Sequence, residues 1–267
     1  MTDRRIASLP PASRIWAVAA VHGEAERLRR LHARLWTALE PGDRLVYLGN
    51  LIGWNDGVRA TLDELLAFRR AVIARPGGFA CHVTYLRGRQ EVMWQKLLQL
   101  QFTPDPAGAL QWMVPRGVGA TLAAYGGDPR VGERAARAGT VALTRWTSGL
   151  REAMKANPGH VELLGRLRSA AVSREDALLF VNTGLDPEKP LHHQGDLFWW
   201  HGAGFNALDP EAGYHGFTRI VRGFDPRQRG ITEHPAKVSL DAGAGFGGPL
   251  AAACFAPDGR MVTRIEA

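Results

Sequence analysis

Residues that could do chemistry stand where apolar runs of the chain end in turns. His22, Arg87 and Arg89 each follow such a run, and Arg222 ends another. An imidazole can bind a metal ion or move a proton, and guanidinium groups pair with phosphate oxygens. If the fold brings these loops together, the three arginines could hold a phosphate or a nucleotide, and His22 could contribute to a metal site.

Each of these residues also has an ordinary structural explanation. A single histidine at a strand-to-helix turn is more often a hydrogen-bonded structural residue than a metal ligand. The arginines could be solvated, or could pair with the acidic residues Glu24, Glu91 and Asp225. We favour this structural explanation for the arginines.

Adjacent histidines and aromatic residues between positions 190 and 200 favour a surface loop. We expect His192 and His193 to lie on an extended segment and to point in opposite directions, which disfavours a shared metal. The run Phe198, Trp199 and Trp200 is expected to anchor this loop on the core, because aromatic side chains bury large apolar areas.

Three aspartates are the material for a rearranged metal centre. Asp56, Asp186 and Asp241 are the carboxylates expected nearest the site. However, Asp56 precedes a glycine and Asp186 precedes a proline, and both pairs are common in ordinary turns.

The elements that must position these residues begin with three strand-loop-helix units. Apolar runs predict strands at 15–21, 44–51 and 79–86. Each run is followed by a turn and then by an amphipathic segment that predicts a helix; these segments are 24–39, 61–75 and 91–101, respectively. Three such units in succession predict an α/β sheet with short loops at the strand ends.

The rest of the chain changes character twice. Residues 104–171 have a mostly helical pattern and are expected to form a helical insertion or cap. Strand patterns follow, with little helix among them, and predict a mixed or antiparallel sheet from the second half; they cover 177–182, 217–222, 237–241, 250–256 and 261–266.

Composition is that of an ordinary globular protein. The chain has 267 residues, of which 45% are hydrophobic and 22% charged, so we expect one domain from 15 to 267 after a flexible segment 1–14. No stretch predicts a signal peptide or membrane span. Cys81 and Cys254 lie in apolar runs and are expected to be buried reduced thiols, which favours the cytoplasm.

The net charge of +7 favours an anionic partner. Phosphate, nucleic acid and anionic lipid all remain open on this ground. Support for nucleic acid is weak, because arginines such as Arg27, Arg29 and Arg30 are spaced as on the solvated face of a helix.

Segments spread over nearly the whole chain resemble the motifs of the calcineurin-like metallophosphoesterases. The strand-end segments read Ala-Ala-Val-His-Gly at 19–23, Gly-Asn-Leu-Ile-Gly-Trp-Asn at 49–55 and Arg-Gly-Arg-Gln-Glu at 87–91. Their family counterparts are Gly-Asp-x-His-Gly, Gly-Asp-x-x-Asp-Arg-Gly and Arg-Gly-Asn-His-Glu. Later segments at 112–126, 181–187, 223–225 and 241–250 also resemble the family, in particular bacterial serine/threonine protein phosphatases and diadenosine tetraphosphatases.

The resemblance implies the family's four-layer sandwich, with two mixed β-sheets flanked by helices and a helical insertion. It also implies a site for two divalent ions that clamp a phosphate and activate a water. The six family metal positions are occupied here by Ala20, His22, Asn50, Arg89, Asn182 and Phe224. Of these, only His22 keeps the family's residue type.

The other catalytic positions of the family also differ. The proton-donor position is Gln90, the position of its partner is Gly53, and the phosphate-clamping arginine is replaced by Trp54. Because glutamine cannot act as a general acid near neutral pH, we predict no catalytic residue.

The sequence therefore predicts a pseudo-phosphatase with a binding or regulatory role and no metal cofactor. Its partner would be a protein or a phosphorylated small ligand. The alternative is a divergent phosphoesterase that hydrolyses phosphoprotein or nucleotide esters with a single or displaced metal (Mn, Fe, Zn or Mg) at His22. That alternative requires Asp56, Asp186 or Asp241 to turn inward beside His22.

Overall fold

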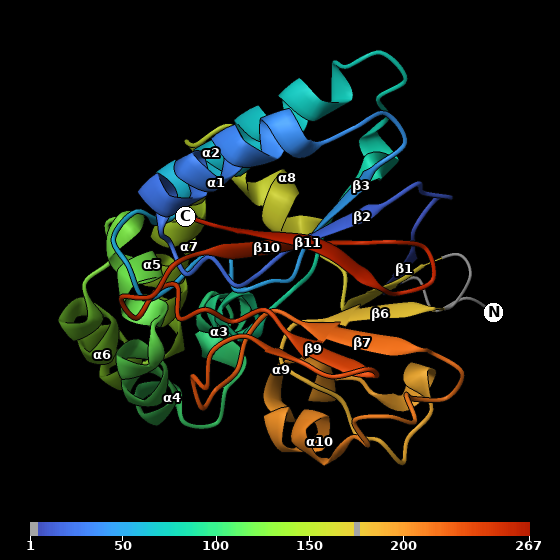
Figure 1. Ribbon diagram of the computed structural model, residues 1–267. Coiled ribbons are helices and arrows are strands. Elements are labelled where there is room, and N and C mark those ends of the chain that lie inside the picture. Colours follow the sequence, from blue (N-terminus) through green and yellow to red (C-terminus); the bar gives the residue numbers. More distant parts are fainter. Residues whose placement is uncertain (1–4, 174–176) are drawn as a thin grey trace.

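A computed structural model describes residues 5–173 and 177–267. Within these residues the strands form two mixed sheets that are stacked on each other and flanked by helices (Figure 1). Helices α1 and α2 cover the outer face of one sheet, and the short helices α9 and α10 lie beyond the other. The predicted arrangement of two mixed sheets between helices is confirmed.

The first sheet has the order β11-β10-β2-β3-β4. Strands β2, β3 and β4 are parallel, and β10 pairs antiparallel with both β2 and β11. The strand bounds are Ile15–Val18 for β2, Arg44–Tyr47 for β3, Val83–Tyr85 for β4, Ala251–Phe255 for β10 and Met261–Glu266 for β11.

The second sheet has the order β1-β5-β6-β7-β9-β8 and mixes parallel with antiparallel pairs. Its strands are β1 Ile6–Ser8, β5 Ala170–Val172, β6 Leu178–Val181, β7 Arg219–Arg222, β8 Thr232–Glu233 and β9 Lys237–Ser239.

Helices that follow β2, β3 and β4 complete the three predicted units. They are α1 Ala25–Ala38, α2 Val58–Ile73 and α3 Arg89–Leu97. In α1 the side chains of Leu28, Leu31 and Leu35 are fully buried on one face, as the apolar spacing predicts.

Between α3 and β5 the chain is helical, as predicted. The helices are α4 Pro106–Met113, α5 Val118–Ala124, α6 Pro129–Ala138, α7 Thr140–Lys155 and α8 His160–Gly165. Pro106 and Pro129 stand in the first turns of α4 and α6, after Asp105 and Asp128, whose side chains accept backbone hydrogen bonds there. Later helices are the short α9 Leu197–Trp200 and α10 Gly202–Ala207.

Two sequence-based expectations about strands are wrong. Strands β10 and β11 join the first sheet rather than a sheet of the second half, because β10 is buried along its whole length and pairs with β2. Residues Ile6–Ser8, expected within a flexible segment, form β1 and pair in parallel with β5. Both outcomes depend on pairing between segments far apart in the sequence.

The expectation for the cysteines is half confirmed. Cys254 is buried in β10, whereas Cys81 is exposed in a 3-10 helix, η1 Ala80–His82, that precedes β4. The strand is thus shorter than the apolar run 79–86 predicted. Among the described residues, no helix is both long and apolar enough to cross a membrane.

Candidate functional site

Loops at the ends of β2, β3, β4, β6 and β7 meet at one place between the two sheets. The backbone amide of His22 donates to the carbonyl of Asn50 (2.7 Å), and that of Phe224 donates to the carbonyl of Asn182 (2.9 Å). The amide of Ala20 donates to the carbonyl of Gly223 (3.0 Å), which joins the first sheet to the second. The structure therefore gathers the family metal positions from both sheets at one mostly buried place between the strand-end loops, which we call the groove.

The His22 side chain is buried among aromatic rings. Its side chain is fully buried, with the ring of Phe224 at 5.1 Å and that of Phe246 at 5.5 Å, both edge to face. Neither ring nitrogen has a hydrogen-bond partner among the described residues. Burial, with a smaller contribution from the charge of Arg89, lowers the pKa of His22 to about 3. The imidazole is therefore neutral at pH 7.

Phe246, which the sequence did not single out, comes from the glycine-rich loop after β9. Gly245 has a φ of +88°, and a Cβ there would lie 2.6 Å from the Cβ of His22, so only glycine allows this close approach. The exposed ring of Trp54 packs on Phe246 at 5.0 Å. A lone aromatic residue among glycines was the available signal, but it does not indicate which neighbour the ring contacts.

Asn50 and Asn182, the two amide side chains at family metal positions, form hydrogen bonds with backbone groups. Asn50 accepts a hydrogen bond from the amide of Gln90 (3.1 Å), and Asn182 accepts one from the amide of Arg89 (3.3 Å). Asn182 also donates to the carbonyl of Leu48 (2.7 Å). Both side chains thus fix the start of α3 against the strand-end loops.

Gln90 and Gly53, which occupy the family's proton-donor and partner positions, are in contact. A Cβ on Gly53 would lie 2.4 Å from the Oε1 atom of Gln90. The Nε2 atom of Gln90 donates to the carbonyl of Arg116 (2.8 Å), and the amide of Trp54 donates to the carbonyl of Gly117 (3.0 Å). The first contact ties α3, and the second the turn after β3, to the helical insertion.

Glu91 anchors the groove through backbone amides rather than through an arginine. Its carboxylate accepts hydrogen bonds from four amides, at 2.7–3.2 Å, contributed by Asn50, Leu51, Ile52 and Gly88. Burial raises the pKa of Glu91, and these hydrogen bonds oppose the rise. A glutamate at the third position of a helix is the sequence signal for such a cap.

Arg87 and Arg89 lie on the tryptophans of α9. The guanidinium of Arg89 is 4.9 Å from the ring centre of Trp200 and 5.6 Å from that of Phe224, and that of Arg87 is 5.9 Å from Trp199. Neither arginine forms an ion pair with a residue that the structure describes. The Nε atom of Arg89 donates a hydrogen bond to the carbonyl of Trp199 (3.5 Å).

Among the described residues, Arg222, unlike Arg87 and Arg89, forms an ion pair with a carboxylate. Its guanidinium is 1% exposed and pairs with Asp225 at 2.7 Å, donates to Ser239 at 3.0 Å and lies 4.2 Å from the ring centre of Phe205. Burial lowers the pKa of Arg222 to about 10, although Asp225 opposes this. The structural alternative, pairing with Asp225, is thus the one the structure supports for Arg222.

Comparison with solved structures identifies the fold. A protein provisionally assigned as a diadenosine tetraphosphatase matches 98% of this chain and 98% of its own, with a TM-score of 0.56 and 16% identity. A serine/threonine phosphatase from Saccharomyces cerevisiae, similar to human PP5, matches 95% of this chain and 77% of its own, with a TM-score of 0.51 and 11% identity. The chain has the metallophosphoesterase fold.

A third solved structure has a lower TM-score. A metallophosphoesterase from Sphaerobacter thermophilus covers 96% of this chain and 88% of its own, with 13% identity and a TM-score of 0.45. No protein-family model and no curated protein matches the chain.

The side chains at the metal positions of the metallophosphoesterase fold do not fit two divalent ions. Ala20 and Phe224 offer no donor atom, Arg89 brings a positive charge, and the His22 ring faces phenyl groups. Within the described parts of the chain, no group of three or more His, Cys, Asp or Glu side chains could hold a metal.

The aspartates considered for a rearranged centre have other partners. Asp241 accepts hydrogen bonds from the amides of Asp225 (2.8 Å) and Gly243 (2.9 Å) through separate oxygens. Asp186 pairs with Lys189 at 3.2 Å, and Asp56 is exposed. Within the described part of the chain, none of the three aspartates forms a hydrogen bond or ion pair with the His22 side chain.

The histidine pair also differs from its expected conformation. His192 and His193 lie in a 3-10 helix, η4 Leu191–His193, with ring centres 4.1 Å apart, rather than on an extended segment. Phe198 and Trp199 are buried in α9, as predicted for an anchor, whereas Trp200 is only half-buried.

Proposed function

We propose that this protein is a non-hydrolytic binding protein built on the metallophosphoesterase fold. The single observation that carries the proposal is the buried His22 ring, packed between Phe224 and Phe246 where relatives of this fold would bind metal. A neutral imidazole enclosed by phenyl rings has no room for an ion or its water ligands. We propose no metal cofactor.

The groove keeps features suited to a phosphorylated ligand. Arg87 and Arg89 carry charges without an ionic partner among the described residues, and they lie on Trp199 and Trp200. Guanidinium groups bind phosphate oxygens, and a half-buried tryptophan offers a surface for an aromatic or peptide group. We propose a phosphorylated small ligand, or a phosphorylated segment of a partner protein, as the groove's ligand.

Metal content and hydrolysis test the non-hydrolytic character. The purified protein should contain no stoichiometric Mn, Fe, Zn or Ni by elemental analysis, and should not hydrolyse an aryl phosphate with any of several divalent ions added. Turnover that disappears in His22→Ala would instead support a divergent phosphoesterase with a single or displaced metal.

Ligand binding in the groove has its own test. Nucleotides should raise the melting temperature of the protein. Arg89→Ala should remove this shift, because the phosphate group of the nucleotide loses the guanidinium that binds it. Arg134→Ala, which changes an exposed arginine on α6, is the matched control. An equal shift in the wild type and in Arg89→Ala would contradict the assignment of the groove.

The state of the cysteines bears on the cellular compartment of the protein. Both cysteines are free thiols, and one of them is exposed. Free thiols are typical of a reducing compartment, so we propose that the protein acts in the cytoplasm.

A further inference from the structure

A second cavity lies at the edges of the two sheets, away from the groove. Its volume is about 600 Å³, and it is bordered by β1, β4, α2 and α8. Its lining shares no residue with the metal positions. A volume of this size suits a small organic ligand.

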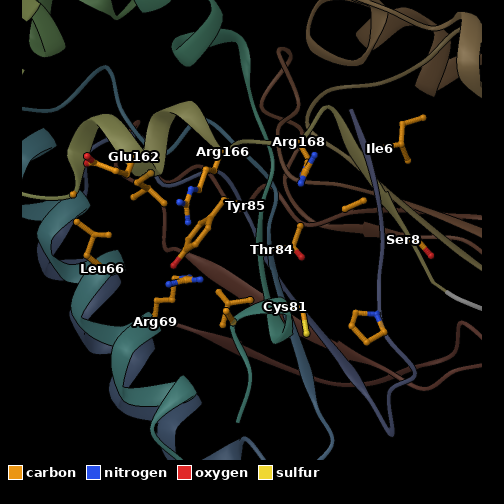
Figure 2. A pocket seen from close by; sticks show the side chains of 16 residues that line it. Ile6, Ser8, Leu66, Arg69, Cys81, Thr84, Tyr85, Glu162, Arg166 and Arg168 are labelled. Carbon is orange, nitrogen blue, oxygen red and sulfur yellow. The ribbon is translucent and has the colours of Figure 1, made fainter. Parts of the chain in front are cut away.

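Two unneutralised arginines reach into this cavity. Figure 2 shows Arg69 of α2 and Arg166, which follows α8, both pointing toward Tyr85. Neither guanidinium forms an ion pair with any residue that the structure describes. Glu162 is the one carboxylate among the described lining residues; it is exposed and also forms no such pair. These two positive charges therefore face one partly open cavity, which is also lined by Arg168, an arginine that already has a partner.

The rest of the lining combines aliphatic side chains with the uncharged hydroxyl groups of Ser8, Thr84 and Tyr85. Leu66, Leu163 and Val83 contribute aliphatic surface. The hydroxyl of Tyr85 already donates to the carbonyl of Leu65 at 3.1 Å. Recognition of a charged group therefore falls to the arginines, while the aliphatic side chains can cover an apolar group.

We propose that this cavity binds a small phosphate monoester with an apolar organic group. A phosphate monoester carries a charge of about −1.5 to −2 at pH 7 and three acceptor oxygens. That charge matches two guanidinium groups, each of which can donate two parallel hydrogen bonds. The proposal concerns a site separate from the groove and does not depend on the groove's function.

Phenylphosphonate is a suitable probe because it has the charge and the apolar ring but cannot be hydrolysed as an ester. Calorimetric titration of the full chain at mildly alkaline pH should give saturable binding. Methylphosphonate should bind more weakly because it lacks the ring, and benzyl alcohol should not bind because it lacks the anion. Absence of saturable phenylphosphonate binding up to about 10 mM would overturn the proposal. Benzoate binding as tight as phenylphosphonate would overturn the phosphate class.

Substitutions locate the site. Arg69→Gln and Arg166→Gln should each weaken phenylphosphonate binding by about tenfold or more. Arg70→Gln is the matched control, because Arg70 is the neighbouring exposed arginine on α2 and does not line the cavity. Binding that Arg70→Gln weakens as much as Arg69→Gln would be non-specific charge attraction and would overturn the proposal.

Cys81 gives a readout confined to this cavity. It lines the cavity and is exposed, whereas Cys254 is buried. Phenylphosphonate should slow alkylation of Cys81 in the wild type and equally in Arg89→Ala, but not in Arg69→Gln. Protection that is lost in Arg89→Ala would place the ligand in the groove and overturn the cavity as its site. Failure of nucleotide binding in the groove would leave this result unchanged.

Discussion

At the scale of single residues, His22 is packed into the core between aromatic rings. A family metal ligand must keep a lone pair toward the ion, but the rings of Phe224 and Phe246 occupy that surrounding space. The imidazole then lies in an apolar environment without a hydrogen-bond partner among the described residues. Such an environment favours the neutral form.

The acid stability of the protein should report this environment. Because the pKa of His22 is about 3 in the folded chain, below its ordinary value of 6.5, the unfolded chain binds more protons between these pH values. The free energy of unfolding should therefore fall as pH decreases below 6.5, with His22 contributing up to about 1.4 kcal/mol per pH unit. His22→Asn should remove this part of the slope, measured by urea denaturation between neutral pH and about pH 5.

The readout is the slope rather than the stability itself, because His22→Asn also changes packing. The same substitution at His192, which is exposed, is the control. An unchanged slope in His22→Asn would show that the ring is not buried as described.

At the scale of elements, the start of α3 organises the groove. The carboxylate of Glu91 binds amides of the turn after β3 and of Gly88, and Asn50 binds the amide of Gln90 in return. Gly88 permits this approach, since a Cβ there would lie 2.3 Å from the backbone nitrogen of Asn50. The groove's shape therefore depends on a helix cap.

Glu91→Gln tests this dependence. One oxygen of the carboxylate serves Leu51 and Ile52, and the other serves Asn50 and Gly88. An amide group retains only one acceptor, so two buried N–H groups lose their partner, and we expect the free energy of unfolding to fall by about 2–4 kcal/mol. Urea denaturation measures the loss. Glu188→Gln, at an exposed position, should change stability by less than about 0.5 kcal/mol; similar losses in both variants would contradict the cap.

At the scale of the whole molecule, β10 connects the two halves. It pairs with β2 in the first sheet (Figure 1). Its residue Phe255 packs edge to face on Phe180 of β6 in the second sheet, with ring centres 6.1 Å apart. Residues from both sheets belong to one continuous apolar core. The two sheets should therefore unfold together.

Phe255→Ala should lower the free energy of unfolding by about 3–5 kcal/mol, because it leaves a cavity at a fully buried position between the sheets. Hydrogen exchange should accelerate by a similar factor in β2 and in β6. The control Val262→Ala, on the exposed side of β11, should have little effect. Acceleration confined to one sheet would indicate that the sheets unfold separately.

What the sequence determined by itself was local. Apolar periodicity and turn residues predicted the three strand-loop-helix units, the helical insertion and the strand ends at which His22, Asn50 and Arg89 meet, because neighbours along the chain set these features. The types of the replaced residues also showed that Ala20 and Phe224 supply no metal ligand.

Only the tertiary structure decided the contacts between distant segments. It joined β10 to β2, placed Phe246 against His22 and buried Arg222 with Asp225 instead of leaving it beside Arg89. Such outcomes depend on which surfaces the packed sheets bring together, and no pattern of neighbouring residues specifies them. For the same reason, the cavity between Arg69 and Arg166, which are far apart in the sequence, emerged only from the fold.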